Sequence, residues 1–306
     1  MRLIDLQNHR CSAPLARMPC RFVEAYWPQH DRCMIVLDDA SGRITLEIDG
    51  FVLEESNLTA DELISIVVWP QFKHSSQRLI VMDVQPYQPW SALDAVMLLP
   101  RHLTPKVAHA ALDYLVAFAR QLQDSVMGEF VARLLLDPSI GIPLLTAKGS
   151  SDHHHAYAGG LLVHTVECMQ LAQSAAAIRG PAMQRLGEHT QVGALIHDLG
   201  KLQLRRAPGS QKLHWLPHQF SVYRLIGSHL QWLAEHDQRA ESEFQATLAH
   251  LATPLSYRRR SSSLVAEFVA LADQQSAIHL GDCGRHQFYA GKAANDSGIG
   301  HQSTRT

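Results

Sequence analysis

Apolar and polar residues alternate in short runs over the first third of the chain. Runs of this β type cover 20–27, 33–37, 43–48, 63–69 and 78–84, and turn-forming residues such as those of 38–42 separate them. This alternation is typical of half-buried strands. Five such runs within roughly 70 residues predict a small closed barrel, and the oligonucleotide-binding (OB) barrel is the commonest five-stranded form.

The period becomes helical after a proline-punctuated segment at 85–90. Thr104 and Pro105 carry the signals of a helix start, so we expect a helix from there to about Gln123. Its apolar face would hold Val107, Ala111, Leu115, Phe118 and Leu122. A second helix is expected at about 125–136, because the residue before Pro138 disfavours helical backbone.

The remaining pattern is helical to about residue 279, and the Gly-rich, polar tail that follows has no period. We therefore expect a multi-domain α and β chain with three parts. Residues 1–90 would form an OB-like nucleic-acid-binding barrel, and residues 91–280 an all-α helical bundle. The tail 281–306 is expected to be disordered.

Composition narrows the class of protein. With 306 residues and 46% apolar content, the chain can fill two cores. No apolar run approaches the ~18 residues of a membrane span, and the N-terminus lacks a signal-peptide core, so we expect a cytoplasmic protein without a membrane partner. The five cysteines are odd in number and scattered, which indicates reduced, structural residues.

The net charge of −2 excludes a chain that is basic all over, so a nucleic-acid surface would have to be local. The unusual count is 19 histidines, concentrated in the last two thirds of the chain. Spacing has to decide which of them carry chemistry.

The chemistry concentrates between residues 152 and 201. Gly159 and Gly160 would start a helix on which His164 and Cys168 lie along one inward strip. His197 and Asp198 end another apolar helix, where Gly200 lets the chain turn sharply. Polar side chains in such apolar runs cost on the order of 1 to 3 kcal/mol unless they find partners. A metal ion would satisfy them together.

Three further residues continue the pattern downstream. His229 lies on an apolar helical stripe, His250 lies in the run Leu-Ala-His-Leu, and Asp273 lies on an apolar helix with little reason to carry a carboxylate. The order along the chain is therefore H, HD, H, H, D.

This order resembles that of the HD-domain metal-dependent phosphohydrolases. The run HHAYAGGLLVHT at 154–165, followed by HDLGK at 197–201, closely resembles the YhaM-type 3′-to-5′ exoribonucleases, which join an OB barrel to an HD domain. The resemblance implies that His164, His197, Asp198 and Asp273 hold a first metal, and that Lys201 faces a phosphate. It also implies a second metal, held by His229 and His250 and bridged by Asp198.

The number and kind of metal ions stay open. His229 is offset by one residue from the family pattern, and Leu251 stands where the family usually has a second histidine, so one or two ions could bind. Imidazole and carboxylate ligands suit Mn, Fe, Co, Ni or Zn, with Mg a further option.

Such a centre lowers the pKa of its bound water from 15.7 to about 7 and polarises a phosphoryl oxygen. The expected reaction is phosphodiester hydrolysis by metal-activated water, with Asp198 and Lys201 as catalytic residues.

Three groups of residues are candidates for substrate binding. His154 and His155 directly precede the helix of His164, and Arg258, Arg259 and Arg260 fall between two predicted ligands, where they could neutralise a phosphate backbone. Trp27 and Trp69 on the predicted barrel could stack bases. Each group has a plainer interpretation as a solvated loop, an exposed turn, or the core and rim of a structural barrel.

The favoured function is a 3′-to-5′ exonuclease on single-stranded nucleic acid, RNA rather than DNA, with a homo-oligomer as an option. The pattern HHHA..GGLL.H at 153–164 also resembles the HD module of TraI- and MobH-type conjugative relaxases, which would point to DNA. The sequence is also compatible with a nucleotide phosphohydrolase and with a catalytically degenerate nucleic-acid-binding protein.

Overall fold

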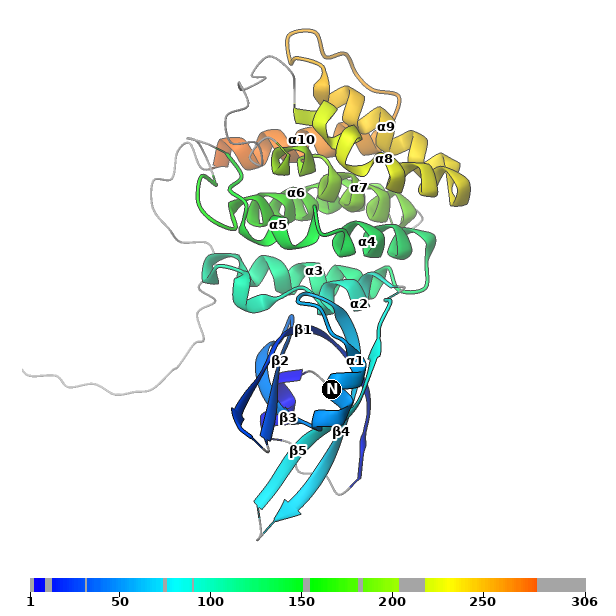
Figure 1. Cartoon of the computed structure of the whole chain (residues 1–306). Coiled ribbons are helices and arrows are strands. Elements are labelled where there is room, and N and C mark those ends of the chain that lie inside the picture. The colour runs from blue at the N-terminus through cyan, green and yellow to red at the C-terminus, as the bar shows by residue number, and fades with distance from the viewer. Residues whose placement is uncertain are drawn as a thin grey trace, which may run out of the picture.

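The computed structural model describes residues 3–8, 13–30, 32–73, 76–89, 91–150, 155–180, 184–203 and 218–279. Within them, a β-barrel is followed by a helical region that packs on one end of it (Figure 1). The predicted tail 281–306 and His154 lie outside the described residues.

The barrel confirms the five predicted strands and lengthens them. They are β1 (Leu15–Gln29), β2 (Arg32–Asp39), β3 (Gly42–Ile48), β4 (Leu63–Lys73) and β5 (Ser76–Pro86). They close in the order β1-β2-β3-β5-β4, with β3 and β5 parallel and the other pairs antiparallel. Helix α1 (Gly50–Ser56) connects β3 to β4, and Asp49 caps it by accepting from Phe51 N and Val52 N. The result is an OB-like barrel.

The helical region begins after β5, and the bounds of its helices are as follows. They are α2 (Ala92–Met97), α3 (His109–Gln121), α4 (Val126–Leu136), α5 (Gly141–Thr146), α6 (Gly160–Ala177), α7 (Gln184–Ile196), α8 (His218–His236), α9 (Gln238–Ala252) and α10 (Leu264–His279). Short 3-10 turns are η1 (Leu3–Asn8), η2 (Arg101–Leu103), η3 (Lys106–Ala108) and η5 (Leu199–Leu202). Helix α4 ends before Asp137, as predicted, whereas the predicted start at Thr104 was wrong. The segment opens with η3, and Val107, which we expected inside, is 56% exposed.

Each region has its own apolar core, and a polar contact joins them. Ala40 N donates to Met97 O at 2.7 Å, and the buried carboxylate of Asp38 lies 3.2 Å from His102 Nδ1. The contact lies at the end of the barrel next to α2 and α3. The hairpin of β4 and β5 points away from the helices (Figure 1).

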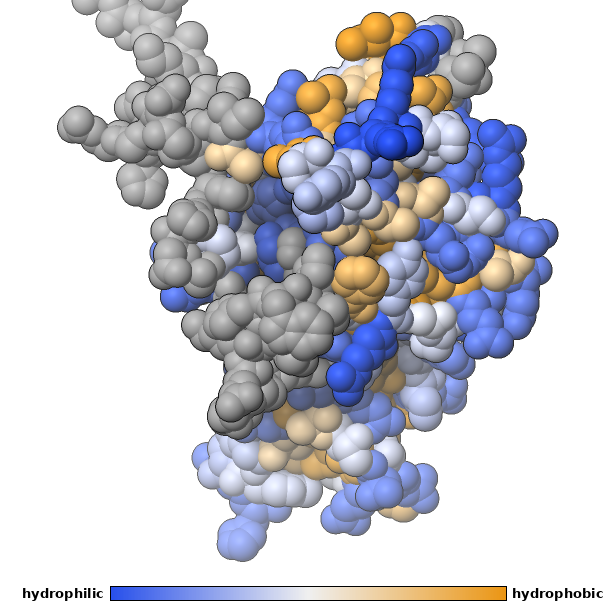
Figure 2. Space-filling view, turned by 90° about the horizontal axis from the view of Figure 1, so that it is seen from above, coloured by the Kyte–Doolittle hydropathy of each residue, from blue (hydrophilic) through white to orange (hydrophobic). Residues whose placement is uncertain are grey.

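Helix α10 packs against α6, α7 and α9, so it brings a late segment of the chain beside the two central helices. The face of the helical region opposite the barrel shows hydrophobic residues interspersed with hydrophilic ones (Figure 2). None of the helices among the described residues is long and apolar enough to cross a membrane.

Candidate metal centre

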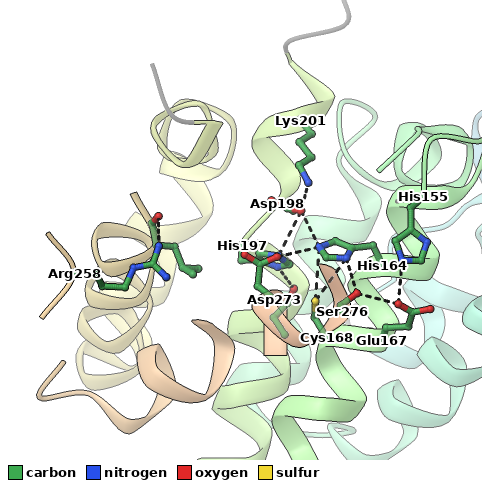
Figure 3. Close-up of polar contacts among 12 residues, drawn as sticks. His155, His164, Glu167, Cys168, His197, Asp198, Lys201, Arg258, Asp273 and Ser276 are labelled. Atoms are coloured by element: carbon green, nitrogen blue, oxygen red, sulfur yellow. Dashed lines mark hydrogen bonds and ion pairs between the residues drawn. The ribbon is translucent and has the colours of Figure 1, made fainter. Parts of the chain in front are cut away.

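The four predicted ligands of the first metal come together from three segments. His164 lies one turn into α6, His197 and Asp198 directly follow α7, and Asp273 lies on α10 (Figure 3). His164 Nε2 is 3.1 Å from Asp198 Oδ2 and 3.4 Å from Asp273 Oδ1. His197 Nε2 is 3.4 Å and 3.6 Å from the same two atoms. Two imidazole nitrogens and two carboxylate oxygens thus face one point.

Two glycines explain how α6 can start beside this point. Gly159 has φ +79°, a left-handed conformation that favours glycine. A Cβ on Gly160 would lie 2.1 Å from the His155 carbonyl oxygen, so only glycine lets the preceding loop pack on the first turn of α6. The Gly-Gly pair therefore places His155 against the helix that carries His164.

Backbone and hydroxyl partners fix which nitrogen of each imidazole faces the centre. His197 Nδ1 lies 2.7 Å from the Ala194 carbonyl oxygen, which can only accept, so Nδ1 carries the hydrogen. Ser276 Oγ donates to Glu167 Oε2 at 2.9 Å and therefore accepts from His164 Nδ1 at 3.0 Å. Both Nε2 atoms are left facing the carboxylates.

This arrangement fits a bound cation. His197 Nε2 is fully buried and has no hydrogen-bond partner, a costly state for a polar atom. Burial would lower the pKa of His164, but Asp198, Asp273 and Cys168 beside it raise it to about 12. The pKa of His197 is likewise raised, against its burial, chiefly by Asp198. Burial would raise the pKa of Asp273, but the two imidazoles beside it hold it below its usual range. The cluster attracts positive charge.

Cys168 is a candidate ligand that the sequence interpretation missed. His164, Cys168, His197 and Asp273 each offer a donor atom within 4.8 Å of the others, so this buried group could hold a metal ion. The Cys168 sulfur lies 3.7 Å from His164 Nε2. Burial would raise the pKa of this thiol, but the two imidazoles lower it overall. Its position one turn after His164 on the inward strip was visible in the sequence, but it fits a core residue equally well.

Lys201 and Asp273 form the accessible side of the centre. Lys201 Nζ pairs with Asp198 Oδ2, and its side chain is partly exposed. The Asp273 side chain is 35% exposed, whereas those of His164, His197 and Asp198 are almost fully buried. A phosphate could therefore approach along Asp273 and meet the ammonium of Lys201.

The residues predicted for a second metal have other neighbours. His229 Nε2 lies 3.1 Å from Oδ2 of Asp137, the residue directly after α4. His250, in the last turn of α9, has its pKa lowered by burial and by Arg258 nearby. Among the described residues, neither histidine belongs to the group that could hold a metal.

The residues predicted to bind substrate are spread over the molecule. Arg258 donates to the carbonyls of Leu251 and Thr253, so its guanidinium is committed to the end of α9 (Figure 3). Arg259 and Arg260 are exposed in the segment after it. His155 is buried and bonded to Tyr157 and Glu167 beside the centre.

The tryptophans on the barrel are half exposed, Trp27 at 50% and Trp69 at 49%. Trp69 lies in the half of β4 that leads to the hairpin tip, which points away from the helical region. The Trp27 ring lies against Gly50, where an added Cβ would come within 2.8 Å of Cη2. Trp27 therefore packs on α1 with one part and is open to solvent with the rest.

Comparison with known proteins adds no assignment. No model of a known protein family matches the chain, and no curated protein matches it in sequence. The geometry of the centre is therefore the basis for a function.

Proposed function

We propose that this protein is an HD-type, metal-dependent phosphodiesterase that shortens single-stranded nucleic acid. The observation that carries the proposal is the meeting of His164, His197, Asp198 and Asp273, in which a fully buried imidazole nitrogen has no hydrogen-bond partner. These four residues, with Cys168 as a further donor, would hold a divalent ion. Such an ion supplies Lewis acidity at the scissile phosphate and makes water a better nucleophile near neutral pH.

The chain's own residues support phosphate chemistry beside that ion. Lys201 contacts Asp198 at the open side of the centre, where its charge can stabilise a phosphoryl oxygen. Asp198, held by Lys201 and both imidazoles, has a fixed orientation. The side chain of Asp273 is partly exposed, so a phosphate from solvent would meet the centre on this side.

The barrel supports nucleic acid rather than a small ester as substrate. Besides the two tryptophans, Tyr26 and Phe72 are also exposed, and stacking on such rings is worth ~1 to 3 kcal/mol per base. Trp27 lies six residues along β1 from Arg21, which contacts Leu98 of the helical region. At ~3.3 Å per residue, the strand between the two residues spans at most about 20 Å. A strand that reaches from this surface to the centre would have to be several nucleotides long.

A nucleotide phosphohydrolase is the second candidate, and one observation fits it: Trp69 lies toward the hairpin tip, which points away from the helical region that holds the centre. A mononucleotide bound at Lys201 could not also reach the distal end of the barrel. In that case, the change Trp69→Ala would leave turnover unaffected.

The test is a gel assay with the full chain, Mn²⁺ and 5′-labelled single-stranded RNA and DNA, with a nucleoside triphosphate assayed in parallel. We expect a ladder of shortened RNA from the wild type and from the control Glu243→Gln, which alters a carboxylate–histidine pair away from the centre. Asp198→Asn should give no ladder. A single-stranded circle of the same sequence should stay intact. Absence of cleavage of either polymer by metal-loaded wild type would overturn the proposal, and release of phosphate from the triphosphate alone would establish the second candidate.

A further inference from the structure

A chain of hydrogen bonds runs from a half-exposed tyrosine to the ligand His164. Tyr157 Oη lies 3.0 Å from His155 Nδ1, and His155 Nε2 lies 3.0 Å from Glu167 Oε2. Ser276 Oγ lies 2.9 Å from the same carboxylate oxygen and 3.0 Å from His164 Nδ1. The chain joins the loop before α6, α6 itself and α10 (Figure 3).

The direction of each bond follows from donor chemistry. A carboxylate accepts only, so Glu167 receives the His155 Nε2 hydrogen and the Ser276 hydroxyl hydrogen. The Ser276 oxygen then has lone pairs for the His164 Nδ1 hydrogen. Glu167 therefore determines, through one hydroxyl, that His164 keeps the hydrogen on Nδ1 and turns Nε2 toward the centre.

The backbone of His155 is held in an unusual conformation to complete this chain. His155 has φ +57°, in the left-handed region, and is buried. Gly149 N donates to its carbonyl at 2.8 Å, and Gly160 allows the close approach described above. Strained residues of this kind persist where the surrounding structure determines them, and they cluster at functional sites.

We propose that Glu167, Ser276 and His155 are positioning residues that hold His164 in the tautomer and orientation needed to bind the metal. The proposal rests on the metal centre of the proposed function. Carboxylate partners of this kind orient ligating histidines in metal sites generally, and their loss costs about 10- to 100-fold in metal affinity. Each of the three residues would act through His164.

The experiment is a Co²⁺ titration of the full chain, followed by visible absorption, which reports the geometry of the ligands. The variants are Ser276→Ala, Glu167→Gln and His155→Asn, because asparagine tolerates the left-handed backbone at 155. Tyr114→Phe is the matched control, since the Tyr114 hydroxyl also joins helices by hydrogen bonds, from α3 to Gln173 of α6 and Gln191 of α7, and neither glutamine is a proposed ligand. Thermal unfolding of each metal-free protein measures stability separately.

We expect Ser276→Ala and Glu167→Gln to weaken Co²⁺ binding about tenfold or more and to alter the spectrum. The control should keep the wild-type affinity and spectrum, whatever its effect on the melting temperature. Variants that melt lower but bind Co²⁺ as the wild type does would overturn the positioning role and leave the centre intact. Wild type that binds no Co²⁺ would overturn the centre, and the positioning role with it.

Discussion

The two groups of histidines predicted to bind metal differ in what surrounds them. His164 and His197 face two carboxylates across distances of 3.1 to 3.6 Å, and their other nitrogens are held by Ser276 and Ala194. His229 and His250 lie on amphipathic helices too, but His229 pairs with Asp137 at the end of α4. An apolar stripe thus predicts that a histidine lies on or near the buried face of its helix. A metal site also needs ligands from other helices that meet this histidine.

The largest effect that separates the two groups should come from Asp273→Asn. This change removes a negative charge that both Nε2 atoms face. Loss of a residue that only hydrogen-bonds to a metal ligand costs up to about 100-fold in metal affinity, so we expect the loss of Asp273, a proposed ligand, to lower Co²⁺ affinity by at least that much. Asp137→Asn is the matched change at His229 and should leave the affinity within about twofold. Calorimetric titration measures both, and equal losses would mean that His229 also contributes to metal binding.

The pH dependence of metal binding tests whether His164 and His197 are the ligands. In the metal-free protein the pKa of His164 is raised to about 12, so protonation of His164 stabilises the fold. This stabilisation is complete below pH 6.5, near the ordinary pKa of histidine, and declines as the pH rises above that value. A metal must displace these protons, so its affinity should increase steadily from pH 6.5 to 9. Affinity that is constant over this range, measured in a non-chelating buffer, would contradict the assignment of both imidazoles as ligands.

Arg258→Ala should affect stability rather than the centre. Its guanidinium donates to carbonyls at the end of α9, and hydrogen bonds to charged groups are worth roughly 1.5 to 3 kcal/mol. Because the site is partly open to solvent, we expect a loss of about 1 to 2 kcal/mol in the free energy of unfolding. Urea denaturation measures it, with Arg259→Ala as the neighbouring control near zero. A normal stability together with weaker RNA binding would instead favour phosphate contact by Arg258.

The smallest effect should come from His229→Ala. Loss of the pair with Asp137, which is partly exposed, should cost about 1 kcal/mol or less and leave the number of bound ions unchanged. A drop in metal content in this variant would show that the second predicted site forms.

Much of the fold was predictable because the two parts of the chain have different periods. The five strands followed from alternation and turns, and the end of α4 from the proline after it. The start of the helix at 104 was wrong because Pro105 fits a 3-10 turn as well as a first helical turn, and this turn leaves Val107 outside. The parallel pairing of β3 with β5 joins distant segments, which no local pattern specifies.

The candidate site was also predictable in part: the sequence indicated its ligands but not the residues around them. His164, His197, Asp198 and Asp273 were unusual polar residues in apolar runs, and they meet. Cys168 was not predictable as a ligand because a lone cysteine on an apolar strip is usually part of a core, and only the fold shows its sulfur beside His164. The Glu167–Ser276 connection spans α6 and α10, so nothing in the spacing of the sequence could indicate it.

The most direct test of the centre is the metal content of the purified full chain. After loading with Mn²⁺ or Co²⁺ and exhaustive dialysis, elemental analysis should find about one ion per chain in the wild type and almost none in His197→Ala, with both proteins folded by circular dichroism. Wild type that retains no ion, or a variant that retains as much as the wild type, would contradict the account.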